Sequence, residues 1–229
     1  NKQMSYGLYK RVEGWFPNSE FHAEGLPSPE ELALMEPLRS KLRPEVFGPA
    51  VISPSTTPPP HSLRENLRQA QKLLAEAGWT YRDGALRNVK GEAFTIEVLN
   101  DQPSTVRVMA PMQGTLRKLG IDMSFRSVDF SLAQQRMDNF DFEMTTIRLP
   151  GSSAPGSELF ERFGSKAAQT PGSSNIWGIQ DPAIDAIVGK VVAAKTRPEL
   201  VTAMRVLDRL LSHGYYGVPQ YYGDAFLIG

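Results

Sequence analysis

The sequence contains no cysteine among its 229 residues. This absence excludes disulfide bonds, thiolate nucleophiles and cysteine-ligated metal sites together. Histidine is almost as scarce: His22, His61 and His213 lie far apart, and none has a second histidine one helical turn away. We therefore interpret the three histidines as exposed or capping residues, and we expect no metal and no cofactor.

The sequence has no excess of either charge. Its 25 basic residues equal its 25 acidic residues, so no net field attracts nucleic acid or an anionic membrane. Arg64, Arg68 and Lys72 share one face of an expected helix, but Glu65 and Glu76 interrupt that positive charge. We interpret this face as solvated and expect no nucleic-acid partner.

No apolar run approaches the roughly 20 residues that span a bilayer. The start, Asn1–Ser5, lacks the basic and apolar regions of a signal peptide as well as an initiator Met. The last residues, Ala225–Gly229, stop within a strand-like pattern. We expect the chain to be a fragment, with an export signal upstream of it.

Familiar catalytic motifs are also missing, because the sequence has no HExxH, GxSxG, Walker A or GxGxxG pattern. Asp138, Asp141 and Glu143 cluster before an expected strand, and paired carboxylates can support acid–base chemistry. A solvated turn explains them more simply. We expect no enzyme, and a carboxylate-based hydrolase is the least favoured alternative.

A regular alternation of strands and helices occupies the middle of the chain. The expected elements are a strand at Phe94–Val98, a helix over 104–119, a strand at Ile121–Phe125, a helix over 131–137 and a strand at Phe142–Ile147. Pro111 and Gly114 should weaken or kink the first of these helices. The rhythm predicts an α/β fold with a mixed, mostly parallel sheet flanked by helices.

Four further helix starts carry N-terminal capping signals. They are Ser28–Glu31, Ser62–Glu65, Asp181–Pro182 and Thr196–Glu199. Between the first two, residues 44–61 contain six prolines, which predicts an extended surface loop or, alternatively, a disordered linker. Residues 215–229 are aromatic and strand-like.

Polar and aromatic side chains follow the expected strands. In open α/β sheets, ligands bind outside the carboxyl ends of the strands, and the hydroxyl-rich and glycine-rich loop after Phe142–Ile147 begins at such an end. Tyr and Trp add stiff surfaces with one polar handle. Trp177 is equally compatible with a core position, and Tyr221 and Tyr222 face opposite ways if they lie on a strand. The candidate ligand-binding residues are Thr145, Thr146, Arg148, Ser152, Ser153, Asn175, Trp177, Gln220 and Tyr221.

A succession of segments along nearly the whole chain resembles the family 5 extracellular solute-binding proteins, the oligopeptide and dipeptide receptors of ABC importers. The likeness is strongest to the subgroup associated with peptide-like cargo such as microcin C. The segments are Asn18–Phe21, Gly25–Leu32, Asn66–Trp79, Leu116–Met123, Asp141–Thr146, Pro171–Asn175, Asp181–Asp185 and Val218–Tyr222. No single motif is diagnostic, but the succession of the segments is fairly specific.

The resemblance implies one lobe of a type II periplasmic-binding-protein-like fold, which closes on its ligand together with a second lobe. Residues 1–229 would form the carboxyl-terminal lobe, with 1–27 as a connection on the hinge side and 215–229 as a strand returning to the missing amino-terminal lobe. In the peptide receptors a carboxylate in the loop that corresponds to Arg148–Ser157 often holds the peptide amino terminus. Here no acidic residue occurs before Glu158, and Arg148 would favour an anionic group; alternatively it is a surface arginine.

We therefore expect a periplasmic receptor that captures a peptide or peptide-like solute for an ABC transporter permease. An independent protein-interaction module, which uses the aromatic carboxyl-terminal segment, is the first alternative. It would require an exposed apolar patch near 215–226.

Overall fold

The computed structural model describes residues 9–50, 57 and 60–223. The chain divides into two compact units. One comprises residues 1–53 together with 150–229 and is called the discontinuous unit; the other comprises residues 54–149 and is called the inserted unit. Each is described by itself.

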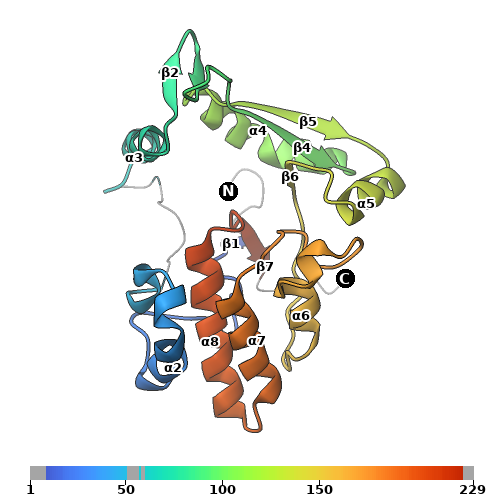
Figure 1. The fold of residues 1–229 in the computed structure, drawn as a ribbon. Helices are drawn as coiled ribbons and strands as arrows, with labels where there is room; N and C mark the ends of the chain where they lie inside the picture. Colours follow the sequence, from blue (N-terminus) through green and yellow to red (C-terminus); the bar gives the residue numbers. More distant parts are fainter. Residues whose placement is uncertain (1–8, 51–56, 58–59, 224–229) are drawn as a thin grey trace. The chain divides into compact units, whose positions relative to one another are not determined.

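A three-stranded parallel sheet forms the centre of the inserted unit (Figure 1). Its strands are β4 (Thr95–Asn100), β5 (Asp122–Ser127) and β6 (Met144–Thr145), in the order β5-β4-β6. Helix α4 (Pro103–Arg117) connects β4 to β5, and α5 (Phe130–Asp138) connects β5 to β6. The predicted alternation and the parallel pairing are confirmed, although β6 is shorter than Phe142–Ile147.

Helix α4 packs on this sheet through its apolar stripe. Met109 is buried with Val98 and Met123 of the sheet, and Met112 packs against the same cluster. Pro111 lies inside α4 without ending it, and the Thr115 Oγ1 hydroxyl donates to the Pro111 carbonyl at 2.9 Å. The predicted weakening at Pro111 therefore does not interrupt the helix.

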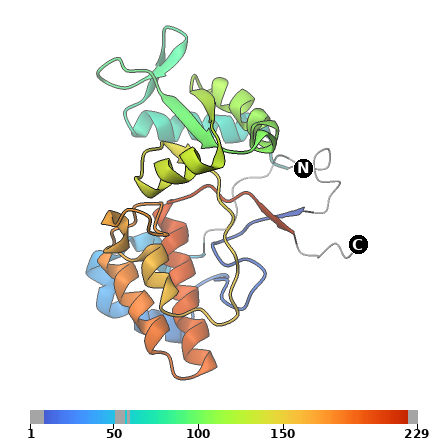
Figure 2. The same cartoon turned by 90° about the vertical axis from the view of Figure 1, so that its right-hand side faces the viewer.

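A second apolar cluster joins the sheet to the start of the unit. Helix α3 (Leu63–Glu76) contributes Leu67, Ala70 and Leu74, which pack against buried Leu86, Leu119 and Ile121. Between them lies an antiparallel hairpin of β2 (Thr80–Arg82) and β3 (Ala85–Arg87), which projects from the sheet (Figure 2). The Asp83–Gly84 turn has positive φ at both positions, as a tight hairpin requires.

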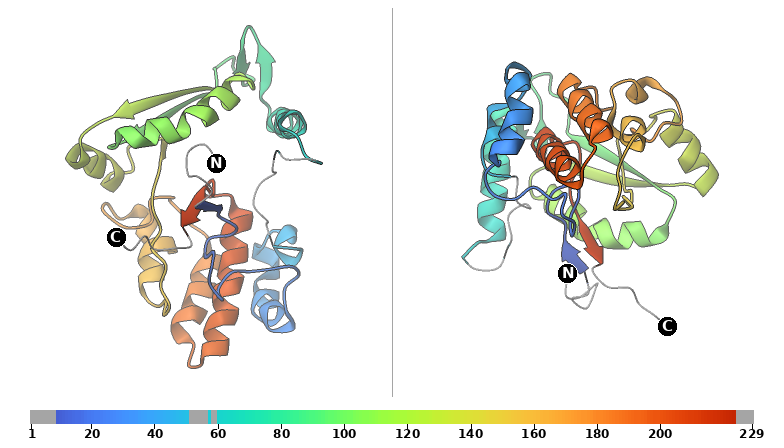
Figure 3. Two further views of the ribbon diagram at one scale, coloured as in Figure 1. Left: turned by 180° about the vertical axis from the view of Figure 1, so that it is seen from behind. Right: turned by 90° about the horizontal axis from the view of Figure 1, so that it is seen from below.

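The discontinuous unit is built on two neighbouring helices, α7 (Pro182–Ala193) and α8 (Arg197–Gly214) (Figures 1 and 3). Short helices α2 (Pro29–Met35) and α6 (Glu158–Phe163) pack beside them, with 3₁₀ turns η1 (Glu36–Lys41), η2 (Pro44–Phe47) and η3 (Ala167–Gln169). The residues predicted to be buried are so: Ile184, Ile187, Val188 and Val191 of α7, and Met204, Leu207 and Leu211 of α8. Leu200 is partly buried against this core.

Two charged residues of α8 also lie in this core. The buried Asp208 carboxylate accepts hydrogen bonds from the backbone N–H of Trp15 (2.5 Å) and Ala23 (2.8 Å), and it contacts His22 Nδ1 at 3.1 Å. Arg209 is 0% exposed and pairs with the Glu31 carboxylate at 2.7 Å. Asp208 thus holds the segment before α2 against α8, and Arg209 holds α2 itself.

The segments at the edges of the discontinuous unit differ in part from expectation. Strand β7 (Tyr221–Gly223) pairs antiparallel with β1 (Tyr9–Arg11), which confirms a strand in the aromatic tail; residues 224–229 lie outside the described residues. The proline-rich segment 44–61 begins with the turn η2, and its Val46 is only 2% exposed. Its first part is therefore anchored in the core, and residues 51–56 and 58–59 are not described. His213 is buried too, against the expectation of exposed or capping histidines.

Candidate functional site

Polar residues line the carboxyl edge of the parallel sheet. Asn100 ends β4 opposite Ser127, which ends β5, and Thr145 of β6 is paired with Leu99. The Ser127 hydroxyl donates to the Asn100 side-chain oxygen at 3.3 Å, and Thr145 Oγ1 donates to the Leu99 carbonyl at 3.1 Å. The buried Asn100 amide nitrogen has no hydrogen-bond partner among the described residues. This edge is therefore polar and held by its own side chains.

Thr145, Thr146 and Arg148 carry the chain away from this edge. Thr145 and Thr146 are half-buried, whereas Arg148 is exposed. No ion pair of Arg148 is present among the described residues. Its guanidinium is therefore available to an anionic group from outside the inserted unit.

The loop 150–157 begins the second part of the discontinuous unit, and hydrogen bonds within that unit order it. Ser152 Oγ accepts from the Ala154 N–H at 3.2 Å, and the Ser153 carbonyl accepts from Arg197 Nη1 at 2.6 Å. The Glu158 carboxylate accepts from the Gly156 N–H at 2.9 Å. Both serines are exposed. The loop thus presents two exposed hydroxyl groups on a backbone that hydrogen bonds within the discontinuous unit hold in place.

Arg197 is the side chain that holds the loop 150–157 in place. A cation at the start of a helix opposes the helix dipole, so its position needs compensating contacts. Its guanidinium pairs with Glu20, with Nε to Oε1 at 2.9 Å, and lies 4.9 Å from the centre of the Phe21 ring. Arg197 therefore joins three segments: the loop, the chain before α2, and α8.

Trp177 belongs to an aromatic cluster. Its ring centre lies 5.1 Å from that of Trp15 and 5.7 Å from that of Phe163. Gly217 packs beside both tryptophans. Trp177 is half-buried and packs against the core, and part of its surface remains accessible.

Asn175 has a structural role. It is 0% exposed, its amide nitrogen donates to the carbonyls of Gly164 and Ile179, and its oxygen accepts from the Ile179 N–H at 3.0 Å. All of these bonds stay within the chain. Asn175 therefore shapes the segment that carries Trp177 and has no surface for a ligand, contrary to its predicted role.

Gln220 and Tyr221 lie at the β1–β7 ribbon. Gln220 is exposed, and its carbonyl accepts from the Val12 N–H at 3.3 Å. Tyr221 is 42% exposed and stacks on Tyr9, with 4.9 Å between the ring centres. Tyr222 is half-buried, and the alternation of a strand sends the two tyrosines to opposite faces.

The nine predicted residues are divided between the two units. Thr145, Thr146 and Arg148 belong to the inserted unit, and the other six belong to the discontinuous unit. Two hollows in the inserted unit contain none of the nine. One is lined by residues of α3 and Lys118, and the other by Glu97, Arg136 and residues 140–143. In the described ranges, no group of acidic or histidine residues is arranged to hold a metal ion.

Neither Arg197 nor Trp15 was among the residues predicted from the sequence to form the site. Arg197 appeared only as part of a helix-capping pattern, and its long-range contacts to Glu20 and Ser153 left no local signal. Trp15 follows Tyr6 and Tyr9 and precedes Phe16, and this concentration of aromatic residues is a signal that could have identified it. Across the described part of the chain, every helix is too short or too polar to cross a membrane.

Comparison with known proteins gives consistent results. Residues 1–171 match the family described as bacterial extracellular solute-binding proteins, family 5 Middle. The chain is 38% identical over 229 residues to the probable peptide-binding protein YejA of Agrobacterium fabrum; the match covers 99% of the chain and 37% of that protein. It is 31% identical over 223 residues to the peptidoglycan-binding protein YepA of the same organism, covering 97% of the chain and 36% of that protein.

Solved structures agree on the fold. The oligopeptide-binding protein AppA of Bacillus subtilis, in complex with a nonapeptide, superposes with a TM-score of 0.61 at 19% identity, over 95% of the chain and 47% of AppA. The fold is thus the α/β fold of type II periplasmic binding proteins. The chain spans little more than a third of the length of the curated relatives it matches. On the match to residues 1–171, the chain belongs to the bacterial extracellular solute-binding proteins of family 5.

Proposed function

We propose that the full-length protein is an extracytoplasmic receptor that captures a peptide-like solute for an ABC importer, and that this chain is its carboxyl-terminal lobe. The observation that carries the proposal is the 38% identity to a probable peptide-binding protein along 99% of the chain. The receptor works in the periplasm and delivers its cargo to a membrane permease. Its role is binding, without catalysis. Neither an interaction module nor a hydrolase has support from the family match.

The ligand-contacting set is the predicted one without Asn175. Ser152 and Ser153 offer hydroxyl groups on a fixed loop, and Trp177 and Tyr221 offer aromatic surface. Such a combination suits a ligand with both polar groups and apolar surface, as peptides have. Thr145, Thr146, Arg148 and Gln220 complete the set.

The charge of the loop suggests a particular class of peptide-like ligand. No acidic residue precedes Glu158 in the loop, and the Glu158 carboxylate accepts a hydrogen bond from the Gly156 N–H. A free ammonium group would therefore find no carboxylate between Arg148 and Ser157, whereas Arg148 can pair with an anion. We propose that the cargo presents a blocked amino terminus or an anionic group to this loop.

Capture proceeds by closure of the two lobes around the solute. Ligand shifts the equilibrium toward the closed state only by as much as it binds that state better than the open one. Polar groups of the ligand must find partners once water is excluded, because an unmet buried donor or acceptor costs about 1–3 kcal/mol. Hydroxyl groups and backbone of the loop 150–157 supply such partners.

Mass spectrometry of the solutes that co-purify with the full-length receptor tests the proposal. We expect short peptides or peptide-containing fragments, with calorimetry on the same compounds showing one site. Sugars or metal chelates as the sole bound solutes would contradict it.

A pair of variants tests the charge of the cargo. Arg148→Gln should weaken binding of an anionic peptide about tenfold, whereas Lys166→Gln, an exposed control outside the set, should leave it unchanged.

A further inference from the structure

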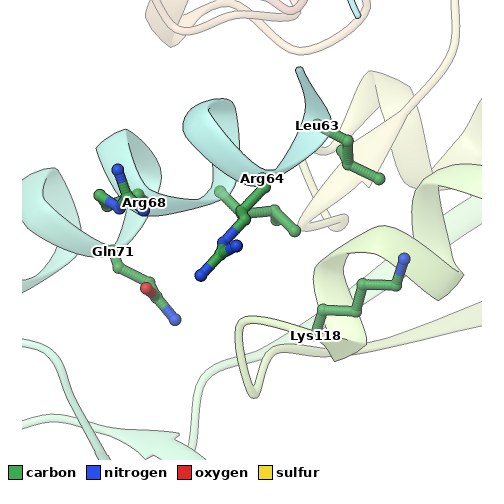
Figure 4. A pocket seen from close by; sticks show the side chains of 6 residues that line it. Leu63, Arg64, Arg68, Gln71 and Lys118 are labelled. Carbon is green, nitrogen blue, oxygen red and sulfur yellow. The ribbon is translucent and has the colours of Figure 1, made fainter.

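A groove of about 550 Å³ runs between helix α3 and the end of α4 in the inserted unit (Figure 4). Its lining residues are Leu63, Arg64, Leu67, Arg68, Gln71 and Lys118. Figure 4 shows Arg64 and Gln71 leaving the same side of α3, with Lys118 on the neighbouring helix end. None of these residues belongs to the proposed ligand-contacting set, so the groove is a separate feature.

The groove is cationic and has no internal counter-charge. No carboxylate of the described residues pairs with Arg64, Arg68 or Lys118, whereas the neighbouring Lys72 does pair with Glu76, at 3.8 Å. Arg64 and Arg68 are four residues apart on one helix, a spacing at which like charges destabilise the helix. The helix dipole favours a cation at the end of α4, which accounts for Lys118 but for neither arginine.

The apolar part of the lining restricts the occupant further. Leu63 is more than a third exposed beside the cations, and Leu67 is half-buried, with part of its side chain packed against the apolar cluster of Leu86, Leu119 and Ile121. An inorganic anion would use the cations and leave this apolar surface in water. A peptide segment with acidic and apolar residues matches both kinds of surface.

We propose that this groove docks an acidic, partly apolar segment of the membrane permease. The inference rests on the proposed function, since a receptor that delivers cargo must meet its permease repeatedly. Cations on a rim act mainly on the rate of encounter and on its salt dependence. The groove therefore governs delivery of the solute, separately from its capture.

The experiment uses the full-length receptor and its permease in proteoliposomes, and it measures ATP hydrolysis against receptor concentration. The variant Arg64→Gln/Arg68→Gln removes both charges while keeping a residue with good helix propensity. The concentration of this variant that gives half-maximal ATP hydrolysis should be about tenfold higher than for the wild type at low salt. That concentration should also depend much less on salt than it does for the wild type. Lys118→Gln, on the other helix, should act in the same direction.

Arg107→Glu provides the matched control, because Arg107 is exposed on α4 outside the groove. It should leave the half-maximal concentration unchanged. Peptide affinity, measured by calorimetry, should be the same in every variant. If folded groove variants stimulate ATP hydrolysis as strongly as the wild-type receptor does, the docking proposal is overturned and the proposed receptor function stands. If the wild-type receptor binds no peptide, the proposed function itself is overturned.

Discussion

At the scale of single residues, the charges within α8 determine how the chain before α2 is held. Arg209 reaches the Glu31 carboxylate at 2.7 Å and also the carbonyls of Glu24 and Gly25 at 3.0 and 3.1 Å. A buried ion pair is stabilising only relative to its broken form, because each charge left alone in the core is strongly disfavoured. The main effect of the Arg209–Glu31 pair is to hold residues 24–31 in a single position.

Arg209→Leu should lower the free energy of unfolding by about 3–5 kcal/mol, because it leaves the Glu31 carboxylate buried without its cation. Arg209→Leu/Glu31→Leu should recover part of this loss, since no lone charge remains. Recovery stays incomplete because the carbonyls of Glu24 and Gly25 lose their donor. Urea unfolding followed by tryptophan fluorescence measures each variant.

The exposed pair Lys72–Glu76 supplies the comparison for this measurement. Lys72→Leu should change the free energy of unfolding by less than about 1 kcal/mol, as is usual for solvated pairs. Similar losses for Arg209→Leu and Lys72→Leu would contradict the structural role given to the buried pair.

His22 couples the same region to pH. The hydrogen bond to Asp208 raises the pKa of His22 above its ordinary value, with smaller contributions from the charges of Asp208, Glu24 and Glu13, and against the effect of burial. A pKa that is higher in the folded state means that the folded state binds the proton more tightly. The resulting stabilisation is complete below about pH 6.5 and is lost as the pH rises through the raised pKa.

His22→Asn tests this coupling, because the Asn amide replaces the donor at Nδ1 without its charge. The difference in free energy of unfolding between wild type and variant should be largest near pH 5.5 and smallest near pH 8.5. Burial lowers the pKa of His213, which is present in both proteins. Its titration therefore contributes equally to both and cancels from the difference. A difference that stays constant from pH 5.5 to 8.5 would show that the His22 charge contributes nothing.

At the scale of elements, local signals predicted most helices and the parallel sheet. Ser28, Ser62 and Thr196 cap their helices as expected, each accepting from the backbone N–H three residues on. Alternation predicted β4 and β5, whose Val98 and Met123 pack against Met109 of α4. These elements are determined by residues close in sequence, so sequence reasoning found them.

The missed elements depend on distant contacts or on signals left unused. The β2–β3 hairpin had an Asp83–Gly84 turn, a usable signal that was overlooked. Helix α6 has six residues, too few for periodicity, and is held by Leu159 and Phe163 in the core. The division of the candidate site between two units likewise has no local sequence signal.

Gly120 ends α4 and allows the chain to enter β5. It has φ +80, and a Cβ there would lie 2.7 Å from both the Leu86 backbone nitrogen and the Tyr81 ring. Gly120→Ala should cost about 2–5 kcal/mol, combining left-handed strain with a backbone clash. Thermal unfolding monitored by circular dichroism measures the loss.

Gly78 after α3 is the matched control, because its φ is +86 but a Cβ there would meet open space. Gly78→Ala should cost about 1–2 kcal/mol, from the left-handed conformation alone. Equal losses at the two glycines would show that the close approach of Leu86 to Gly120 has no energetic weight.

At the scale of the whole molecule, the proposed function requires more chain than these 229 residues. The relatives are nearly three times as long, and the proposed mechanism places the solute between two lobes. One lobe supplies only part of the contacts that offset the loss of ligand freedom on binding. Folding and ligand binding should therefore be separable, because each unit has its own buried core. Capture, on the proposed mechanism, would require the partner lobe.

Calorimetry on residues 1–229 and on the full-length receptor, with one peptide that co-purifies with the latter, tests this separation. The isolated chain should bind at least about 100-fold more weakly, which corresponds to about 2.7 kcal/mol. Near-ultraviolet circular dichroism establishes that the isolated chain is folded, so that weak binding is not a consequence of unfolding. Equal affinities in two folded proteins would place the whole binding site within this chain, and closure of two lobes would then be unnecessary for capture.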